Sequence, residues 1–292
     1  NTGIQFVEIS SNDSWARDIG PTFVKNRSTG EVRGVDWRFN AWGGKYDGLY
    51  SDWKDDDAFA TKVCSKENKE CYHLEDFILE GGSIHVDGDG TCITTEACLL
   101  SAGRNSNKTK GEIEEYLRQY LNVERVIWLK NGIYLDETNE HVDNMINFIS
   151  PGKVTLAWTD DVNDNQYEYS IAAFEVLTES LDARNRKFEI IKLQVPGPLF
   201  VTEDEFRSYN NYESDNNNCL VKAHDRLPAS YTNFYLCNNA AIVPIFGDEK
   251  NDNNAISILK SVMPDREIIP IYSREILLGG GNVHCITQQQ PA

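Results

Sequence analysis

The residues best suited to chemistry in this 292-residue chain are one cysteine, one histidine and three carboxylates. They lie far apart in sequence, each beside a turn or a glycine run: Asp18 in WARDIG, Glu80 in LEGG, His141 and Asp143 in EHVDN, and Cys285 in GGGNVHC. A thiolate is a nucleophile once a nearby base or cation lowers its pKa, and a histidine can carry protons. Carboxylates bind a planar guanidinium through paired, charge-assisted hydrogen bonds. This set therefore fits attack by sulfur on a guanidinium carbon.

A unit repeated along the chain could bring these residues together. It consists of a short apolar run, a turn with glycine or polar residues, and a second apolar run. We identify five instances, at residues 6–24, 77–95, 141–158, 230–246 and 276–288. The turn dipeptides Asp-Gly, Pro-Gly and Asn-Asn accept the backbone angles that a hairpin reversal demands.

Helices are expected between several of these hairpins, because apolar residues there recur at spacings of three and four. The predicted helices are 111–121, 172–181 and 254–263, and the asparagine-rich stretches 214–218 and 251–254 are predicted to be loops. Strands alternating with helices indicate an α/β fold of repeated ββαβ modules around a centre. We expect the chemical residues on the inner hairpin ends, with the first module lacking its upstream half and the fifth lacking a last strand.

Composition excludes several classes of function. Hydrophobic residues make up 40% of the chain, and no run approaches the roughly 20 apolar residues of a membrane span. The net charge of −18 argues against nucleic acid and suits a small cationic partner, although acidic surfaces usually serve solubility.

The seven cysteines form no CxxC pair and no Cys/His metal spacing, so neither a metal site nor a cofactor is predicted. An odd number leaves at least one thiol unpaired within the chain. The chain shows no signal peptide at its start, which predicts a cytoplasmic location.

Five stretches of the chain resemble motifs of the agmatine deiminase family in their order and spacing. This family is part of the guanidine-modifying (pentein) superfamily. The stretches are SNDSWARDIGPTF, LEGGSIHVDGDGT, DETNEHVDN, LAWTDDVND and LLGGGNVHCITQQQPA. The resemblance implies a pentein α/β propeller of about five ββαβ modules around a pseudo-fivefold axis, with residues 1–292 as one deiminase domain. It implies hydrolysis of agmatine to N-carbamoylputrescine and ammonia through a covalent amidino-cysteine, in putrescine biosynthesis.

The resemblance also implies roles for individual residues. Cys285 matches the nucleophile, His141 the general acid and base, and Glu80 the carboxylate that orients this histidine. Asp18 and Asp143 match the pair that grips the guanidinium. Further candidates for contacts to the substrate are Glu137, Gln288 and Trp15, with a core position as the alternative for the tryptophan.

Two departures from the family pattern carry expectations. Glu140 occupies a position where the family usually has glycine, so its side chain either disturbs the backbone and the substrate or adds a charge for a cationic tail. Family members also carry a further N-terminal segment. We expect that restoring such an extension raises activity and melting temperature together.

The remaining signals have simpler interpretations. His284 would point away from the site if its segment were a strand, and His73, His85 and His224 are expected to be surface or core residues. The DGDG turn at 87–90 lacks the later ligands of a calcium loop and is predicted to be a β-turn.

Two other functions remain open. A peptidylarginine deiminase would use the same chemistry on a substrate without an ammonium tail, and a catalytically inactive binding module could use the same scaffold. The sequence leaves a homo-oligomer open.

Overall fold

The computed structural model of this protein describes residues 3–212 and 222–291. The stretch 214–218, predicted to be a loop, lies outside the described residues. Within the described ranges, no helix is long and apolar enough to cross a bilayer.

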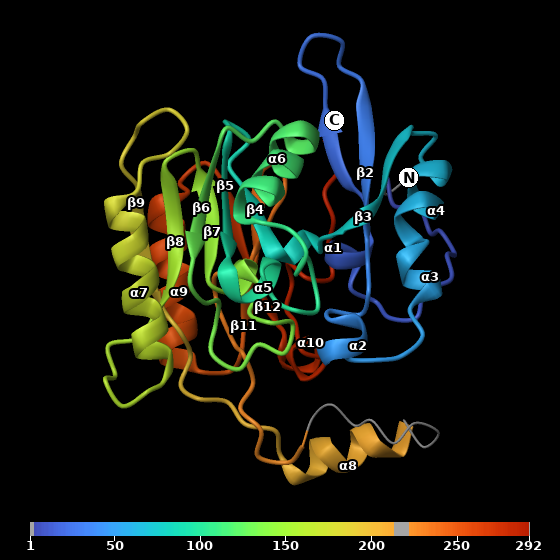
Figure 1. Cartoon of the computed structure of the whole chain (residues 1–292). Coiled ribbons are helices and arrows are strands. Elements are labelled where there is room, and N and C mark those ends of the chain that lie inside the picture. The colour runs from blue at the N-terminus through green and yellow to red at the C-terminus, as the bar shows by residue number, and fades with distance from the viewer. Residues whose placement is uncertain (1–2, 213–221, 292) are drawn as a thin grey trace.

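The strands of the described residues form four three-stranded sheets built to one plan (Figure 1). The first two strands of each sheet are antiparallel, and the third pairs in parallel with the second. The sheets contain β1 (Thr22–Lys25), β2 (Val32–Arg38) and β3 (Cys71–Ile78); β4 (Ile84–Val86), β5 (Thr91–Thr95) and β6 (Arg125–Leu129); β7 (Ile146–Ser150), β8 (Lys153–Trp158) and β9 (Glu189–Gln194); and β10 (Tyr235–Leu236), β11 (Ala240–Ile245) and β12 (Glu267–Tyr272).

A helix connects the second and third strands of every sheet, because a parallel pair needs a crossover connection. These helices are α4 (Phe59–Lys66), α6 (Lys110–Leu121), α7 (Gln166–Glu179) and α9 (Glu249–Val262). A capping box formed by Thr109 and Glu112 begins α6, and Asn122 ends it with a left-handed φ of 55°. The α/β class and the repeated ββαβ plan are therefore confirmed.

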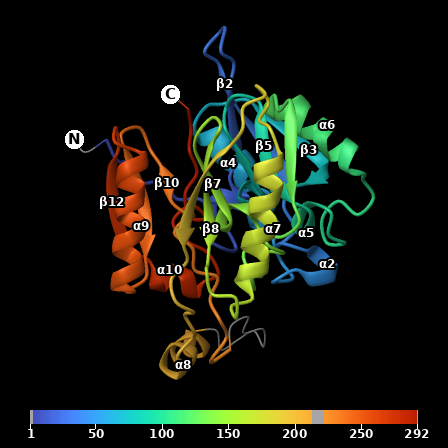
Figure 2. The same cartoon turned by 90° about the vertical axis from the view of Figure 1, so that its left-hand side faces the viewer.

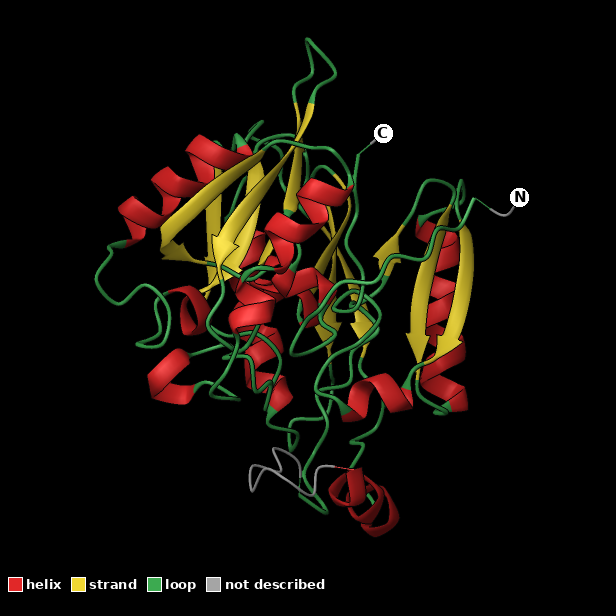
Figure 3. Ribbon diagram, turned by 90° about the vertical axis from the view of Figure 1, so that its right-hand side faces the viewer, coloured by secondary structure: helices red, strands yellow, loops and turns green. Residues whose placement is uncertain are grey.

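Apolar faces of the crossover helices bury against their sheets. Residues such as Leu117 of α6, Leu177 of α7 and Leu259 of α9 are fully buried. Figure 2 shows α7 and α9 running along the sheets, and Figure 3 shows the helices and strands from the opposite side. Burying each such leucine contributes about 1.5–3 kcal/mol.

The remaining helices are short, apart from α8. They are α1 (Ala16–Ile19), α2 (Gly44–Asp47), α3 (Lys54–Asp57), α5 (Glu96–Leu99), α8 (Glu203–Tyr212), α10 (Arg274–Leu278) and the 3₁₀ turns η1 (Gly81–Ser83) and η2 (Val142–Asn144). Figure 1 shows α8 below the sheets.

Three of the five predicted hairpins are confirmed, with turns at 87–90, 151–152 and 238–239. Asp87 accepts hydrogen bonds from the backbone of Asp89 and Thr91 in the first of these turns, as expected of a plain β-turn. The predicted helices are also confirmed, although α7 and α9 begin earlier than expected.

The predictions at the two ends of the chain were wrong. Residues 4–9 form no strand, and Phe6 is 96% exposed, so their apolar side chains do not belong to a sheet face. The first hairpin is instead β1–β2. At the other end, the predicted strands of 276–288 are helix α10 and a turn that begins at Gly280, whose φ is 97°.

The predicted loop at 251–254 was also wrong, because these residues lie within α9. Asp252 is buried there and accepts hydrogen bonds from the Tyr231 hydroxyl and from the backbone N–H groups of Phe246 and Gly247. Burial and tertiary hydrogen bonds thus override the loop preference of an asparagine-rich stretch.

Candidate active site

The predicted carboxylates and His141 occupy equivalent places in the repeats, just before the first strand of a sheet. Asp18 in α1 precedes β1, Glu80 precedes β4, and His141 and Asp143 precede β7. The last segment of the chain joins them, since the backbone N–H of Arg17 donates to the carbonyl oxygen of Cys285 at 3.0 Å. The repeat therefore gathers residues that are distant in sequence.

Gly82 marks the point where three of these side chains meet. A Cβ atom on Gly82 would lie 2.6 Å from His141 Nδ1, 2.9 Å from Asp18 Oδ1 and 3.1 Å from Asp143 Oδ2. An ordinary carbon contact is about 3.5 Å. Only glycine therefore fits here, and its lack of a side chain lets His141, Asp18 and Asp143 come this close to the backbone.

His141 is buried between two carboxylates. Its Nδ1 lies 3.9 Å from Asp18 Oδ2, and its Nε2 lies 3.8 Å from Glu80 Oε2. Burial alone would lower the pKa of His141, but the nearby Asp18, Cys98 and Glu80 raise it well above its ordinary value. The imidazole is thus held as a cation and can act as an acid.

Glu80 is held by an arginine that sequence reasoning missed. Arg104 Nε donates to Glu80 Oε1 at 2.7 Å, and both side chains are fully buried. Burial opposes ionisation of Glu80, but Arg104 and His141 lower its pKa. The second oxygen, Oε2, has no hydrogen-bond partner and faces the imidazole. Glu80 can therefore orient and charge His141.

Asp18 has both carboxylate oxygens fixed by donors. Gly82 N–H donates to Oδ1 at 2.9 Å, and Trp42 Nε1 donates to Oδ2 at 3.0 Å. Burial raises the pKa of Asp18 to about 6, even though His141 opposes this shift. A cation that enters the site would favour the ionised carboxylate.

Asp143 has one oxygen held and one without a partner. His284 Nδ1 lies 2.7 Å from Oδ2, whereas the buried Oδ1 has no hydrogen-bond partner. Burial opposes ionisation, but the hydrogen bond from His284 lowers the pKa of Asp143. A buried carboxylate oxygen without a donor indicates a place for a ligand N–H group.

Cys285 lies beside this carboxylate. Its Sγ is 3.5 Å from Asp143 Oδ2 and 3.4 Å from Asn233 Nδ2. Burial, together with the charges of Asp143 and Asp18, raises the pKa of the thiol well above its ordinary value. The thiol is therefore neutral in the free site, and a bound cation would lower its pKa.

Glu137 and Trp15 lie along the glycine run that leads to Cys285. Glu137 lines a pocket of about 250 Å³ together with Asp225, Leu278 and Gly280. Burial and the neighbouring Asp136 raise the pKa of Glu137 to about 7. The Trp15 ring packs against Gly279 and Gly281 and belongs to the same buried cluster as Cys285.

Gln288 is not brought into this cluster. Its amide oxygen accepts from Arg17 at 2.6 Å, and its amide nitrogen donates to the Pro21 carbonyl at 2.7 Å. Both ends are thus used to tie the last segment to α1, so the predicted contact to a substrate tail has no geometric support.

Glu140 has the backbone conformation that the glycine of the family pattern suggests, with a φ of 64°. Its carboxylate accepts hydrogen bonds from Asn131 Nδ2 at 2.8 Å and from the Gly132 N–H at 3.1 Å. These bonds hold the side chain against residues 131–132, and they offset the cost of a left-handed φ, about 1–2 kcal/mol.

Sequence reasoning also missed Asn233, Trp42 and the position of His284. Asn233 precedes β10 as the other site residues precede their sheets, so the repeat itself could have identified it. The prediction that His284 faces away was wrong, because residues 283–286 form a turn rather than a strand. Burial and the Arg17 charge lower its pKa to about 4, so His284 is neutral and holds Asp143.

Among the described residues, Glu80, Cys98 and His141 place possible metal ligands within 4.8 Å of one another. Glu80 is already engaged by Arg104, and His141 is held as a cation. These pairings suit proton transfer better than metal binding, since a metal needs the neutral imidazole.

Known proteins are similar to this chain in sequence and in fold. The model of the Porphyromonas-type peptidyl-arginine deiminase family matches residues 1–291. A "Putative agmatine deiminase" of Mycoplasma capricolum subsp. capricolum is 54% identical over 99% of this chain and 77% of that relative.

Two solved structures are also similar. An agmatine deiminase of Enterococcus faecalis is 45% identical, with a TM-score of 0.88 over 97% of this chain and 76% of that one. An agmatine deiminase of C. jejuni with substrate bound is 30% identical, with a TM-score of 0.82 over 98% of this chain and 76% of that one. The chain belongs to the Porphyromonas-type peptidyl-arginine deiminase family.

Proposed function

We propose that this chain hydrolyses agmatine to N-carbamoylputrescine and ammonia through a covalent amidino-cysteine. The observation that carries the proposal is the unpartnered Oδ1 of the buried Asp143, next to the Cys285 thiol. A guanidinium presents several N–H donors in one plane. It would pair with Asp143 on one edge and Asp18 on another, which places its carbon beside the sulfur.

Substrate binding prepares the nucleophile. The guanidinium brings a positive charge next to the thiol, reversing the effect of Asp143 and Asp18 on its pKa. The thiol then releases its proton to water, since His141 is already protonated, and the thiolate adds to the guanidinium carbon. The resulting tetrahedral intermediate expels one nitrogen as ammonia, which takes its proton from the His141 imidazolium.

The second half of the reaction uses the same histidine as a base. Neutral His141 takes a proton from water, and the hydroxide adds to the carbon of the amidino-cysteine. The C–S bond then breaks, which releases the carbamoyl product and returns the thiolate. Glu80 stabilises the charged imidazole in both half-reactions.

The acidic pocket at Glu137 supports agmatine as the substrate. Agmatine carries an ammonium at the far end of its tail, and Glu137 and Asp225 offer carboxylates beside Gly280, close to the nucleophile's loop. Arg226 also lines this pocket, but its guanidinium is paired with Asp164. A peptidyl arginine presents neutral amides at this position and would leave the partly buried carboxylate of Glu137 without a cationic partner. The pocket therefore favours agmatine over the peptidylarginine alternative.

The experiment compares ammonia release from agmatine, a blocked arginine peptide and free arginine. The proposal expects turnover of agmatine at a much higher kcat/KM than the others, and loss of turnover in Cys285→Ala. Cys237→Ala is the matched control, since that partly buried thiol lies in the β10–β11 turn. Preference for the blocked peptide would favour the peptidylarginine reaction, and no turnover with any substrate would favour an inactive binding module.

The same proposal includes the finer points of fold and location. The four sheets and the segment around Cys285 would surround a pseudo-fivefold axis as a pentein propeller, with residues 1–292 as one deiminase domain. The protein would act in the cytoplasm in putrescine biosynthesis, and a homo-oligomer remains compatible with this role.

A further inference from the structure

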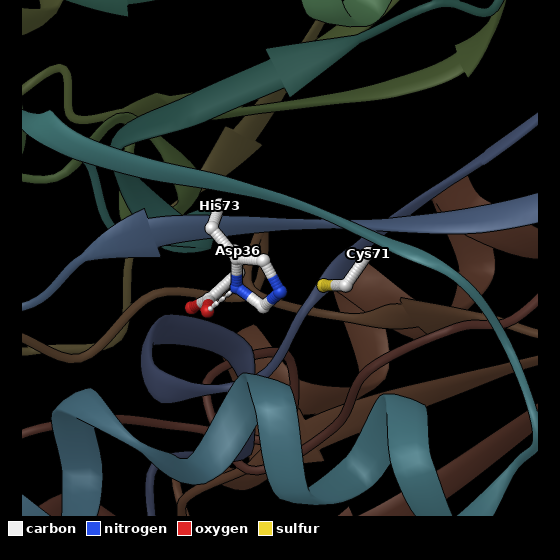
Figure 4. A group of neighbouring side chains, drawn as sticks. All are labelled: Asp36, Cys71 and His73. Atoms are coloured by element: carbon white, nitrogen blue, oxygen red, sulfur yellow. Dashed lines mark hydrogen bonds and ion pairs between the residues drawn. The ribbon is translucent and has the colours of Figure 1, made fainter.

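A second group of chemically active side chains lies on the sheet β1–β2–β3, where it joins α4. Parallel pairing of β2 with β3 places Asp36 beside His73 and Gly34 beside Cys71. Because strand side chains alternate, Cys71 and His73 share one face. Figure 4 shows Asp36, Cys71 and His73 turned toward one another. Their potential ligand atoms lie within 4.8 Å of each other.

A fourth side chain reaches this face from the crossover helix. Cys64 of α4 places its Sγ 3.1 Å from the Sγ of Cys71. Gly34 makes this possible, because a Cβ atom there would lie 2.3 Å from the Cys64 sulfur and 3.1 Å from the Cys71 sulfur. The two thiols therefore meet above a residue without a side chain.

The imidazole of His73 is oriented by a carboxylate. His73 Nδ1 lies 2.8 Å from Asp36 Oδ2, and the Thr61 hydroxyl of α4 donates to the same oxygen at 2.8 Å. In Figure 4 the other ring nitrogen of His73 is turned toward the Cys71 sulfur. A histidine that donates one N–H to a carboxylate presents its second nitrogen to a metal, as in many zinc sites.

We propose that Cys64, Cys71 and His73 bind one Zn²⁺ ion, with Asp36 as the residue that orients the histidine. Two sulfurs and one imidazole nitrogen are donors that zinc prefers, and the fourth tetrahedral position would hold water. The side chain of His73 is 54% exposed, which leaves a path for the ion and that water. Each thiol gives up its proton as its Zn–S bond forms.

We expect this site to contribute to the stability of the fold and to take no part in the proposed reaction. Its ligands connect α4 with β3, and Asp36 extends the connection to β2. Beyond β2 the chain runs to Trp42, the tryptophan that holds Asp18. Zinc would therefore stabilise the module that carries part of the site, independently of the proposed reaction.

Sequence spacing gave no indication of this site. Six residues separate Cys64 from Cys71, and this spacing matches no common zinc motif. The parallel pairing of β2 with β3 and the packing of α4 over Gly34 bring the ligands together.

The test uses the full chain, reduced with a phosphine and freed of metal by a chelator. Co²⁺ is added as a spectroscopic probe, and Zn²⁺ is then added in competition. We expect a thiolate-to-cobalt charge-transfer band that one equivalent of zinc removes. We also expect the melting temperature to rise by about 5 °C when the free zinc concentration is a hundred times the dissociation constant of the site.

Variants locate the metal. The double variant Cys64→Ser/Cys71→Ser should lose the band. Asp36→Asn and His73→Ala keep both sulfurs, and each should weaken zinc binding by about tenfold or more, as expected for loss of a second-shell partner or a ligand. Cys237→Ser serves as the control thiol. The Cys98→Ser variant tests whether zinc binds instead at the group of Glu80, Cys98 and His141. It should bind zinc as tightly as the unaltered chain.

Three outcomes would overturn the proposal. One is zinc binding by the double cysteine variant equal to that of the unaltered chain. Another is loss of the cobalt band in Cys98→Ser alone. The third is recovery of Cys64 and Cys71 as a disulfide, with no zinc bound after reduction. None of these outcomes bears on agmatine turnover, so the reaction is tested separately.

Discussion

A methyl group at position 82 should damage catalysis strongly. In Gly82→Ala the new Cβ would lie 2.6 Å from His141 Nδ1 and within 3.1 Å of carboxylate oxygens of Asp18 and Asp143. Relative to a carbon contact of about 3.5 Å, these groups must move by roughly 0.5–1 Å. The three side chains that would be displaced are the ones proposed to bind the guanidinium and to transfer its protons.

The magnitude follows from the displacement. Misplacing catalytic groups by about 1 Å costs on the order of 100-fold in rate, and overpacking of a buried site costs about 1–3 kcal/mol of stability. We therefore expect kcat/KM for agmatine to fall by about 100-fold or more, with a smaller loss in the free energy of unfolding. The assays are ammonia release and urea unfolding.

Gly111→Ala is the matched control. A Cβ atom at Gly111, near the start of α6, meets no atom within 4 Å, and its φ is not left-handed. Alanine there should leave kcat/KM unchanged and stabilise the fold by about 0.4–1 kcal/mol. If Gly82→Ala kept kcat/KM within twofold of the unaltered chain, the positions of His141, Asp18 and Asp143 against Gly82 would not matter for catalysis.

Three further predictions follow from the charges of the site. Glu137→Gln should raise KM for agmatine by about tenfold to 100-fold, since hydrogen bonds between charged groups contribute about 1.5–3 kcal/mol. It should barely change KM for butylguanidine, which lacks the ammonium. Equal effects on both substrates would exclude a contact between Glu137 and the tail of agmatine. Because the pKa of Asp18 is about 6, kcat/KM measured from pH 5 to 8 should fall below pH 6. Because the pKa of Asp18 is higher in the folded than in the unfolded chain, its ionisation lowers the free energy of unfolding. About 3 kcal/mol of this free energy, present below pH 4, is lost as the pH rises through 6, and urea unfolding at several pH values measures the loss. An Asp18→Asn variant with the same pH dependence would contradict the assignment. Arg104→Met should lower the free energy of unfolding by about 3–5 kcal/mol, because it removes the cation that donates to the buried Glu80 Oε1. A loss below 1 kcal/mol would show that Glu80 is not held in this way.

The local parts of the fold were predictable because short-range rules decide them. Turns such as Asp87–Gly90 and amphipathic helices such as α6 depend on neighbouring residues alone. Residues 4–9 and 276–288 have apolar runs typical of strands, but a strand also needs a partner, and the sequence does not show one. The asparagines of α9 form a helix because tertiary burial outweighs their local preference.

The site was predictable only in part for the same reason. The motif resemblance identified the residues that the repeats bring together, from Asp18 to Cys285. It did not identify Arg104 or Asn233, which support other side chains and carry no motif of their own. Gln288 lies in a matching motif, but Arg17 and Pro21 occupy its amide. Hydrogen-bond partners of this kind require three-dimensional contacts.

The most direct test of the central claim is to trap the intermediate. Acid quenching during turnover of agmatine, followed by peptide mass spectrometry, should find the amidino adduct on the peptide that contains Cys285. The adduct should accumulate in a His141→Asn variant if ammonia loss still proceeds, because the water would lack its base. Ammonia release without any adduct, or with an adduct on another cysteine, would contradict the account.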